Sequence, residues 1–144
     1  MSAITIRDLD HVVLRTAQPD TMVRFYTEVL GCPVERSLDI GLVQLRAGRS
    51  MIDIVPSDSE LGRRGGNAPD AGARNMDHFC VRIEPFDEPA IRAQLRQHGI
   101  DADETSVRYG AEGNGPSIYI QDPDGNTVEL KGPPTENGAR AGQS

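Results

Sequence analysis

Aromatic residues, cysteines and long apolar runs are scarce in this chain. Of its 144 residues none is tryptophan, three are tyrosine and three are phenylalanine. Cys32 and Cys80 are too few for a disulfide framework and form no CxxC motif. No apolar stretch approaches the roughly 20 residues of a membrane span, and residues 1–8 lack the apolar segment of a signal peptide. These absences predict a cytoplasmic protein of a reducing compartment.

Basic residues are also in the minority, because 15 Lys and Arg stand against 22 Asp and Glu, for a net charge of −7. A nucleic-acid partner requires a basic face, so this balance argues against one. It equally disfavours an anionic membrane surface. The length suits one compact domain or two small packed modules. A small molecule is therefore the expected partner.

Two short stretches of the chain resemble each other. Leu9-Asp10-His11-Val12-Val13-Leu14 and Met76-Asp77-His78-Phe79-Cys80-Val81 each place a histidine after an aspartate, at the start of an apolar run. The two histidines are 67 residues apart, a little under half of the chain. A histidine that recurs at one place in a repeated unit suggests two copies with both imidazoles near a shared axis, and paired imidazoles suit a transition metal.

The pattern of apolar residues predicts the same order of elements in both halves, a strand and a helix followed by three strands. The fold class is therefore α+β, with paired βαβββ modules. In the first half we expect a helix capped by Asp20 and ended by Gly31, and strands at 7–16, 34–38 (poorly marked), 41–46 and 50–55. In the second half we expect strands at 77–84, 106–109, 117–121 and 127–131, with a helix at 87–98 and a Gly-rich turn at 110–116. The predicted modules are 1–56 and 76–132, joined by a Gly-rich linker at 57–75 and followed by a flexible tail at 133–144.

Four titratable residues alternate with apolar neighbours in the expected strands: His11, Asp53, His78 and Glu129. Because residues two apart share a face of a strand, all four should lie on the face opposite the helices. Two imidazoles and a carboxylate bind a divalent first-row metal and leave positions open for substrate. Asp53 could be a ligand, a general base or an outer-shell residue. The alternative reading makes His11 an ordinary strand-end residue and both acids solvent-facing.

These residues resemble a known family, the vicinal oxygen chelate superfamily, over about residues 9–132. It includes glyoxalase I, extradiol dioxygenases, fosfomycin-resistance transferases and bleomycin-resistance proteins. The segments that carry the likeness are the first His-containing strand, Phe25-Tyr26-Thr27-Glu28-Val29-Leu30-Gly31, and the closing hairpin from Ser117 to Leu130. Gly115-Pro116-Ser117-Ile118-Tyr119-Ile120 is similar to the branch called glyoxalase domain-containing protein 5-like.

The resemblance implies an eight-stranded, cup-shaped mixed sheet around a metal, commonly in a homodimer. It implies that His11, His78 and Glu129 are the metal ligands. Asp53 falls where glyoxalase I has a fourth ligand, usually a glutamate, and is one methylene shorter. Tyr119, expected on the face of Glu129, could hydrogen-bond a chelated substrate oxygen or be a packed aromatic residue.

The leading hypothesis is a metal-dependent lyase or dioxygenase that acts on a small oxygenated substrate chelated to a divalent metal, which could be Zn, Ni, Mn, Co or Fe(II). A metal-free antibiotic- or metabolite-binding protein is the first alternative. A fosfomycin-type thiol transferase is the second, with Arg15, Arg82 and Arg108 as candidate cations for the phosphonate. Whether the modules of one cup come from one chain or are swapped between partners is left open.

Overall fold

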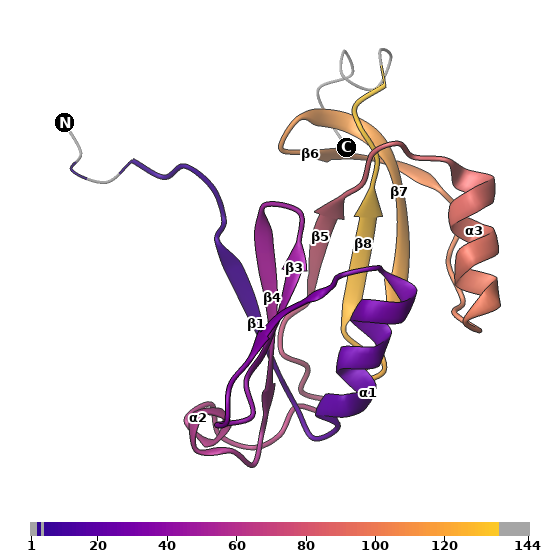
Figure 1. Ribbon diagram of the computed structural model, residues 1–144. Coiled ribbons are helices and arrows are strands. Elements are labelled where there is room, and N and C mark those ends of the chain that lie inside the picture. The colour runs from indigo at the N-terminus through magenta and orange to yellow at the C-terminus, as the bar shows by residue number, and fades with distance from the viewer. Residues whose placement is uncertain (1–2, 4, 136–144) are drawn as a thin grey trace. The chain divides into compact units, whose positions relative to one another are not determined.

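Each half of the chain forms a four-stranded mixed sheet in which the first strand pairs in parallel with the last (Figure 1). The computed structural model describes residue 3 and residues 5–135. The chain divides into two compact units, Met1–Pro69 and Asp70–Ser144, and this boundary falls inside the predicted linker. The α+β class and the βαβββ order of strands and helices are confirmed.

Unit 1, residues 1–69, has the sheet order β1-β4-β3-β2, and every pairing except that of β1 with β4 is antiparallel. The weakly marked strand predicted around 34–38 is present. The elements are β1 (His11–Thr16), α1 (Pro19–Arg24), η1 (Phe25–Val29), β2 (Val34–Ser37), β3 (Val43–Ala47), β4 (Ser50–Pro56) and α2 (Glu60–Arg63).

Unit 2, residues 70–144, repeats this plan with the sheet order β5-β8-β7-β6. Its helix begins after Asp87, whose side chain accepts a hydrogen bond of 3.1 Å from the backbone N–H of Ala90 and so caps the first turn. The elements are β5 (His78–Arg82), α3 (Glu88–Gln97), β6 (Ser106–Gly110), β7 (Gly113–Gln121) and β8 (Thr127–Lys131).

Alternation along the strands separates the core from the opposite face of each sheet. The apolar residues of the alternating pattern form the core, because transfer of apolar surface out of water is favourable. In unit 1 the buried side chains include Leu14, Met22, Tyr26, Leu45, Ile52 and Ile54, and in unit 2 they include Leu95, Ile118, Ile120, Val128 and Leu130. The titratable residues of interest occupy the intervening positions, so the predicted assignment of faces is correct.

The first helix differs from the prediction. Its N-cap is Gln18, which makes no side-chain capping bond, and Asp20 lies within the first turn, where a negative charge favours the helix N-terminus. The α-helix gives way at Phe25 to the π-helical turn η1. The hydroxyl of Thr27 donates to the carbonyl oxygen of Val23, 2.8 Å away. This side-chain bond occupies a carbonyl of the preceding turn and accompanies the wider helical geometry.

The Gly-rich stretch 110–116 is mostly strand, where a turn was predicted. β7 begins at Gly113, and only Ala111 and Glu112 connect the paired residues Gly110 and Gly113. A Cβ atom at Gly115 would lie 2.8 Å from the carbonyl oxygen of Pro133. Glycine is therefore required at this position of β7, because the backbone of Gly132 and Pro133 passes too close for a side chain.

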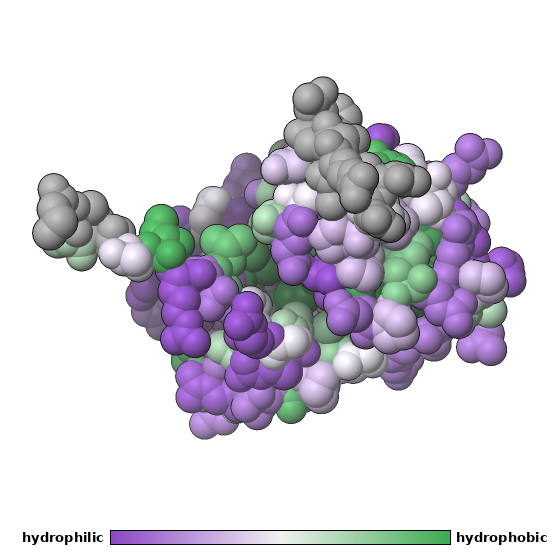
Figure 2. Space-filling model, turned by 90° about the horizontal axis from the view of Figure 1, so that it is seen from above, coloured by the Kyte–Doolittle hydropathy of each residue, from purple (hydrophilic) through white to green (hydrophobic). Residues whose placement is uncertain are grey.

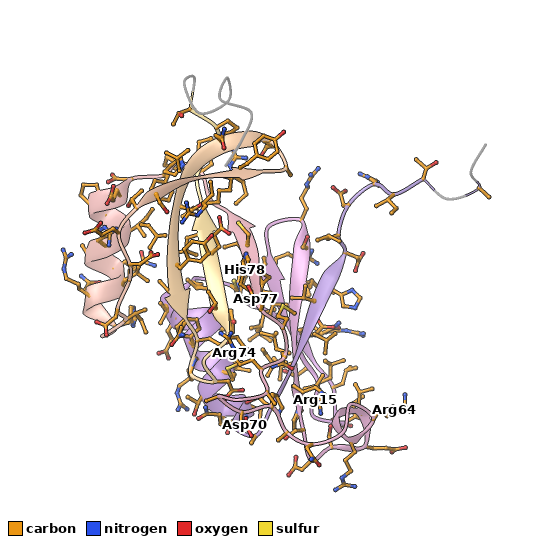
Figure 3. The ribbon with its side chains drawn as sticks, turned by 180° about the vertical axis from the view of Figure 1, so that it is seen from behind. Arg15, Arg64, Asp70, Arg74, Asp77 and His78 are labelled. Atoms are coloured by element: carbon orange, nitrogen blue, oxygen red, sulfur yellow. The ribbon has the colours of Figure 1, made fainter. Side chains whose placement is uncertain are left out.

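The predicted linker contains local structure. The side chain of Ser59 accepts a hydrogen bond from the N–H of Gly62 and caps α2. The guanidinium group of Arg15, on β1, donates to the carbonyl oxygens of Gly62, Gly66 and Asn67 at 3.0 to 3.1 Å (Figure 3). This part of the segment is thus held to the first strand. Of the predicted flexible tail, residues 136–144 lie outside the described residues.

A β-bulge shifts the pairing of β2 with β3. Val34 pairs with Leu45, but Arg36 pairs with Gln44, so Glu35 is an extra residue on β2. The carboxylate of Glu35 instead forms an ion pair of 3.0 Å with Arg46. The bulge therefore determines which residue of β2 lies beside Gln44.

The face seen in Figure 2 is mostly hydrophilic, with hydrophobic residues in small separate groups. Exposed large apolar residues of the described chain include Val13 on β1 and Val107 and Tyr109 on β6. Among residues 3 and 5–135, no helix is long and apolar enough to cross a membrane.

The β7–β8 hairpin is closed by a turn centred on the side chain of Asp122. This carboxylate is 5% exposed and accepts hydrogen bonds of 2.9 Å from the N–H groups of Asp124 and Asn126 and from the side-chain amide of Asn126. Gly125 adopts a φ of 82°, which favours glycine. The turn fixes the register of β8 against β7.

We predict that Asp122→Ala destabilises the protein by about 2–3 kcal/mol, because three donors lose a buried charged acceptor. Urea unfolding followed by circular dichroism measures this change. Glu104→Ala, at an exposed position before β6, is the control and should change the free energy of unfolding by less than about 0.5 kcal/mol. Equal effects of the two substitutions would contradict the role of the turn.

Candidate metal site

In unit 1 the parallel pairing of β1 with β4 brings a histidine and a carboxylate together. His11 is in register with Met51, and Asp53 lies two residues further along β4, on the same face. The Nε2 atom of His11 is 4.0 Å from Oδ2 of Asp53. His11 lies on the exposed edge strand, whereas Asp53 is only 4% exposed.

Unit 2 repeats this arrangement in the same register. His78 pairs with Thr127, and Glu129 lies two residues further along β8. The Nε2 atom of His78 is 3.4 Å from Oε1 of Glu129, which is 6% exposed. Asp53 and Glu129 are therefore equivalent positions of the repeat. Both carboxylates are buried, so the alternative in which the two acids face solvent is wrong.

Each imidazole is also bound through its second nitrogen. Nδ1 of His11 is 2.7 Å from Oδ1 of Asp10. Nδ1 of His78 is 2.6 Å from Oδ2 of Asp77, and Figure 3 labels these two residues. The hydrogen bond to Asp10 raises the pKa of His11, with a smaller contribution from the charge of Asp53 and with desolvation opposing. The bond from His78 lowers the pKa of Asp77. With Nδ1 engaged, Nε2 is the nitrogen presented to each carboxylate.

The two buried carboxylates have different donors. Oδ2 of Asp53 accepts a hydrogen bond of 3.1 Å from the side-chain amide of Gln44, on β3. Oε2 of Glu129 accepts one of 2.6 Å from the hydroxyl of Ser117, on β7. Oδ1 of Asp53 is buried and has no hydrogen-bond partner among the described residues. A buried acceptor without a donor is uncommon, and a proton or a cation would satisfy it.

Sequence reasoning gave no role to Asp10, Asp77, Gln44 or Ser117. The two aspartates were visible as part of the repeat, and their place before each histidine was the available signal. Gln44 and Ser117 carried no such signal, because their contacts depend on the strand register. The site in each unit thus includes more residues than the sequence predicted.

Tyr119 lies directly opposite Glu129 in the β7–β8 pairing, on the face where it was predicted. Its ring centroid is 5.8 Å from that of His78, with the ring planes at 76°. Burial raises the pKa of Tyr119, a hydrogen bond with Arg108 opposes this effect, and both the charge of Glu129 and a hydrogen bond with it add to the rise. The phenol is therefore protonated at neutral pH and can donate a hydrogen bond.

The three candidate cations are already engaged. Arg15 donates to the carbonyl oxygens of the segment after β4. Arg82 pairs with Glu84 at 2.7 Å and also with Glu112. Arg108 contacts the carbonyl oxygen of Val107 as well as Tyr119. An anionic substrate group would have to compete with these interactions.

Cys80, in register with Glu129, is on the same face of unit 2. Desolvation, followed by the charge of Glu129, raises the pKa of its thiol to about 11, while Lys131 opposes the shift. The thiol is consequently protonated near neutral pH, and protonated thiols are poor nucleophiles and poor metal ligands.

The donors suit a divalent cation, since each unit offers an imidazole nitrogen and a buried carboxylate. Within either unit no third His, Cys, Asp or Glu of the described residues joins the pair. Neutral imidazoles and carboxylates are ligands of Zn and of other first-row metals. The unpartnered Oδ1 of Asp53 is the observation that agrees best with a cation or a transferable proton at this face.

Comparison with known proteins places the chain in a family. A family model described as Glyoxalase/Bleomycin resistance protein/Dioxygenase superfamily matches residues 8–130. The chain is 30% identical over 134 residues to the glyoxalase domain-containing protein RDO1 of Mycosarcoma maydis. The aligned region covers 88% of this chain and 69% of that protein. It is also 30% identical over 129 residues to the virulence protein STM3117 of Salmonella typhimurium, covering 85% and 81%.

Solved structures agree with this assignment. The crystal structure of the same Salmonella typhimurium virulence protein has a TM-score of 0.76 at 26% identity, covering 90% of this chain and 99% of that chain. The structure of an integron cassette protein from the mobile metagenome of V. Cholerae also gives a TM-score of 0.76 at 26% identity. The match covers 91% of this chain and 98% of that chain. The chain therefore belongs to the glyoxalase/bleomycin resistance protein/dioxygenase superfamily, the vicinal oxygen chelate family.

Proposed function

We propose that this protein is a metal-dependent enzyme in which His11, His78 and Glu129 hold a divalent first-row metal and a small oxygenated substrate binds through adjacent oxygens. One observation carries the proposal. Two histidine–carboxylate pairs occur in identical register, each with a buried carboxylate and an imidazole Nε2 directed at it. Three protein ligands leave positions for substrate, as catalytic metal sites require.

A metal bound by these residues would supply Lewis-acid polarisation of the substrate oxygens. Asp10 and Asp77 hold each imidazole in the tautomer that leaves Nε2 free as a ligand. Ser117 donates to Oε2 of Glu129, and Oε1 is the oxygen that lies 3.4 Å from Nε2 of His78, on the side where the metal would bind. These contacts keep the ligands oriented before any substrate arrives.

Asp53 is the proposed general base. It is buried, one of its oxygens lacks a partner among the described residues, and its position is equivalent to that of Glu129. A free carboxylate oxygen can accept a proton from a substrate carbon or hydroxyl group. Tyr119 donates a hydrogen bond to a substrate oxygen that gains negative charge. This assignment favours proton-transfer chemistry of the lyase or isomerase type over a dioxygenase reaction.

We predict that EDTA-treated protein takes up Zn, Ni, Mn, Co or Fe(II), and that binding raises its melting temperature because the metal binds the folded state. His11→Ala, His78→Ala and Glu129→Gln should each weaken binding by on the order of a hundredfold, since each removes a direct ligand. Metal titration with thermal-shift detection, checked by elemental analysis, measures both effects.

His98→Ala is the matched control, because His98 is an exposed residue at the end of α3. It should bind metal like the wild type. Absence of metal uptake by the wild type would contradict the proposal and favour a metal-free binding protein. So would a loss of affinity in the control as large as that in His78→Ala.

The aspartates behind the histidines give a separate prediction. Asp10→Asn and Asp77→Asn should each weaken metal binding by roughly 10- to 100-fold, because the hydrogen bond that orients the imidazole and increases its basicity is lost or reversed. The same titration measures the change. Asp39→Asn, at an exposed position between β2 and β3, is the control, and affinities equal to the control in both variants would show that the aspartates have no such role.

A further inference from the structure

A row of polar side chains crosses the sheet of unit 1 and ends at Asp53. Arg36 pairs with Gln44 between β2 and β3, and Gln44 pairs with Asp53 between β3 and β4. Residues directly opposite each other in adjacent strands project from the same face. The three side chains therefore lie next to one another on the face that carries His11.

The hydrogen bonds of this row all donate toward Asp53. Nε of Arg36 donates to Oε1 of Gln44, and Nε2 of Gln44 donates to Oδ2 of Asp53 at 3.1 Å. A guanidinium group can only donate, so it fixes the amide oxygen of Gln44 toward β2. The amide nitrogen must then face Asp53. Gln44 is 8% exposed and Asp53 is 4% exposed, so water competes little for either bond.

The β-bulge in β2 makes this row possible. Without the extra residue, Glu35 would take the place of Arg36 opposite Gln44. A carboxylate there would accept a hydrogen bond from the amide and turn its nitrogen away from Asp53. The bulge supplies a donor at this position and leaves Glu35 to pair with Arg46.

Unit 2 orients its carboxylate differently. The position equivalent to Gln44 is Tyr119, whose phenol is hydrogen-bonded to Glu129 and to Arg108, and the carboxylate of Glu129 also accepts from Ser117. The amide of Gln44 is therefore the feature specific to unit 1, since unit 2 has a phenol at the equivalent position. It occupies Oδ2 and leaves Oδ1 buried and without a partner among the described residues.

We propose that Gln44, held by Arg36, is a positioning residue that orients Asp53 by binding Oδ2, the oxygen that lies 4.0 Å from Nε2 of the proposed metal ligand His11. This inference rests on the proposed function, because that function gives Asp53 its role beside the metal. Gln44 acts only through Asp53, and Arg36 acts only through Gln44.

The first test uses nuclear magnetic resonance on ¹⁵N-labelled protein in EDTA, where no metal is present. In the wild type the side-chain amide of Gln44 should be protected from hydrogen exchange, and Asp53→Ala should remove that protection. Arg36→Met should weaken it, whereas Arg36→Lys, which keeps a donor, should restore it at least partly. Arg24→Met, at an exposed position in the last turn of α1, is the matched control and should leave the protection of the Gln44 amide unchanged. An unprotected amide in the wild type, or one that does not respond to Asp53→Ala, would overturn the inference.

The second test is a double-mutant cycle on Co²⁺ binding. Gln44→Met should weaken binding several-fold while Asp53 is present, because Asp53 then no longer holds its charge beside the cation bound at His11. In the Asp53→Asn background it should have no further effect, because Gln44 no longer has a carboxylate to orient. Independent, multiplicative losses would overturn the inference. Failure of the wild type to take up Co²⁺ would contradict the proposed function, and the metal-free resonance test would still decide whether Gln44 orients Asp53.

Discussion

The parallel pairing of the first strand with the last strand in each unit is the constraint on which the site depends. It brings His11 beside Asp53 and His78 beside Glu129, although each pair is separated by more than forty residues of sequence. Because side chains alternate between the faces of a strand, a slip of one residue would place each carboxylate among the core residues. Buried apolar side chains on either side of each carboxylate, such as Ile52 and Ile54, make that slip unfavourable. The packing of the core and the geometry of the site are therefore set by the same register.

Burial gives the two acids their chemical character. A carboxylate removed from water is stable only when donors or cations compensate for the lost solvation. Glu129 has Ser117 and the imidazole of His78 close by, whereas Asp53 has Gln44 on one oxygen and nothing among the described residues on the other. The repeat thus keeps one pattern of strands but provides two different environments. A fold made of two similar units can in this way assign separate roles to equivalent positions.

Much of this arrangement was predictable from the sequence, because the alternation of apolar residues is a local property. It gave the order of strands and helices along the chain, and in each unit the face that carries the histidine and the carboxylate, His11 and Asp53 in unit 1 and His78 and Glu129 in unit 2. Gly115 was misread because a glycine required by a close backbone approach looks the same in sequence as one required by a turn. The roles of Gln44 and Ser117 were not predictable, since both depend on which residues pair across strands. For Arg36 the register also depends on a bulge that no local pattern marks.

The turn around Asp122 has a consequence for how the site in unit 2 forms during folding. Ser117, Tyr119 and Glu129 all belong to a hairpin whose strands are joined by five residues, so their mutual contacts require only a short loop to close. His78 must come from a strand 49 residues before its partner Thr127, and loop-closure entropy makes such pairings slower to form. The carboxylate and its donors can be in place before the histidine arrives. Loop-closure entropy therefore favours an order of assembly in which the acid is placed before the imidazole.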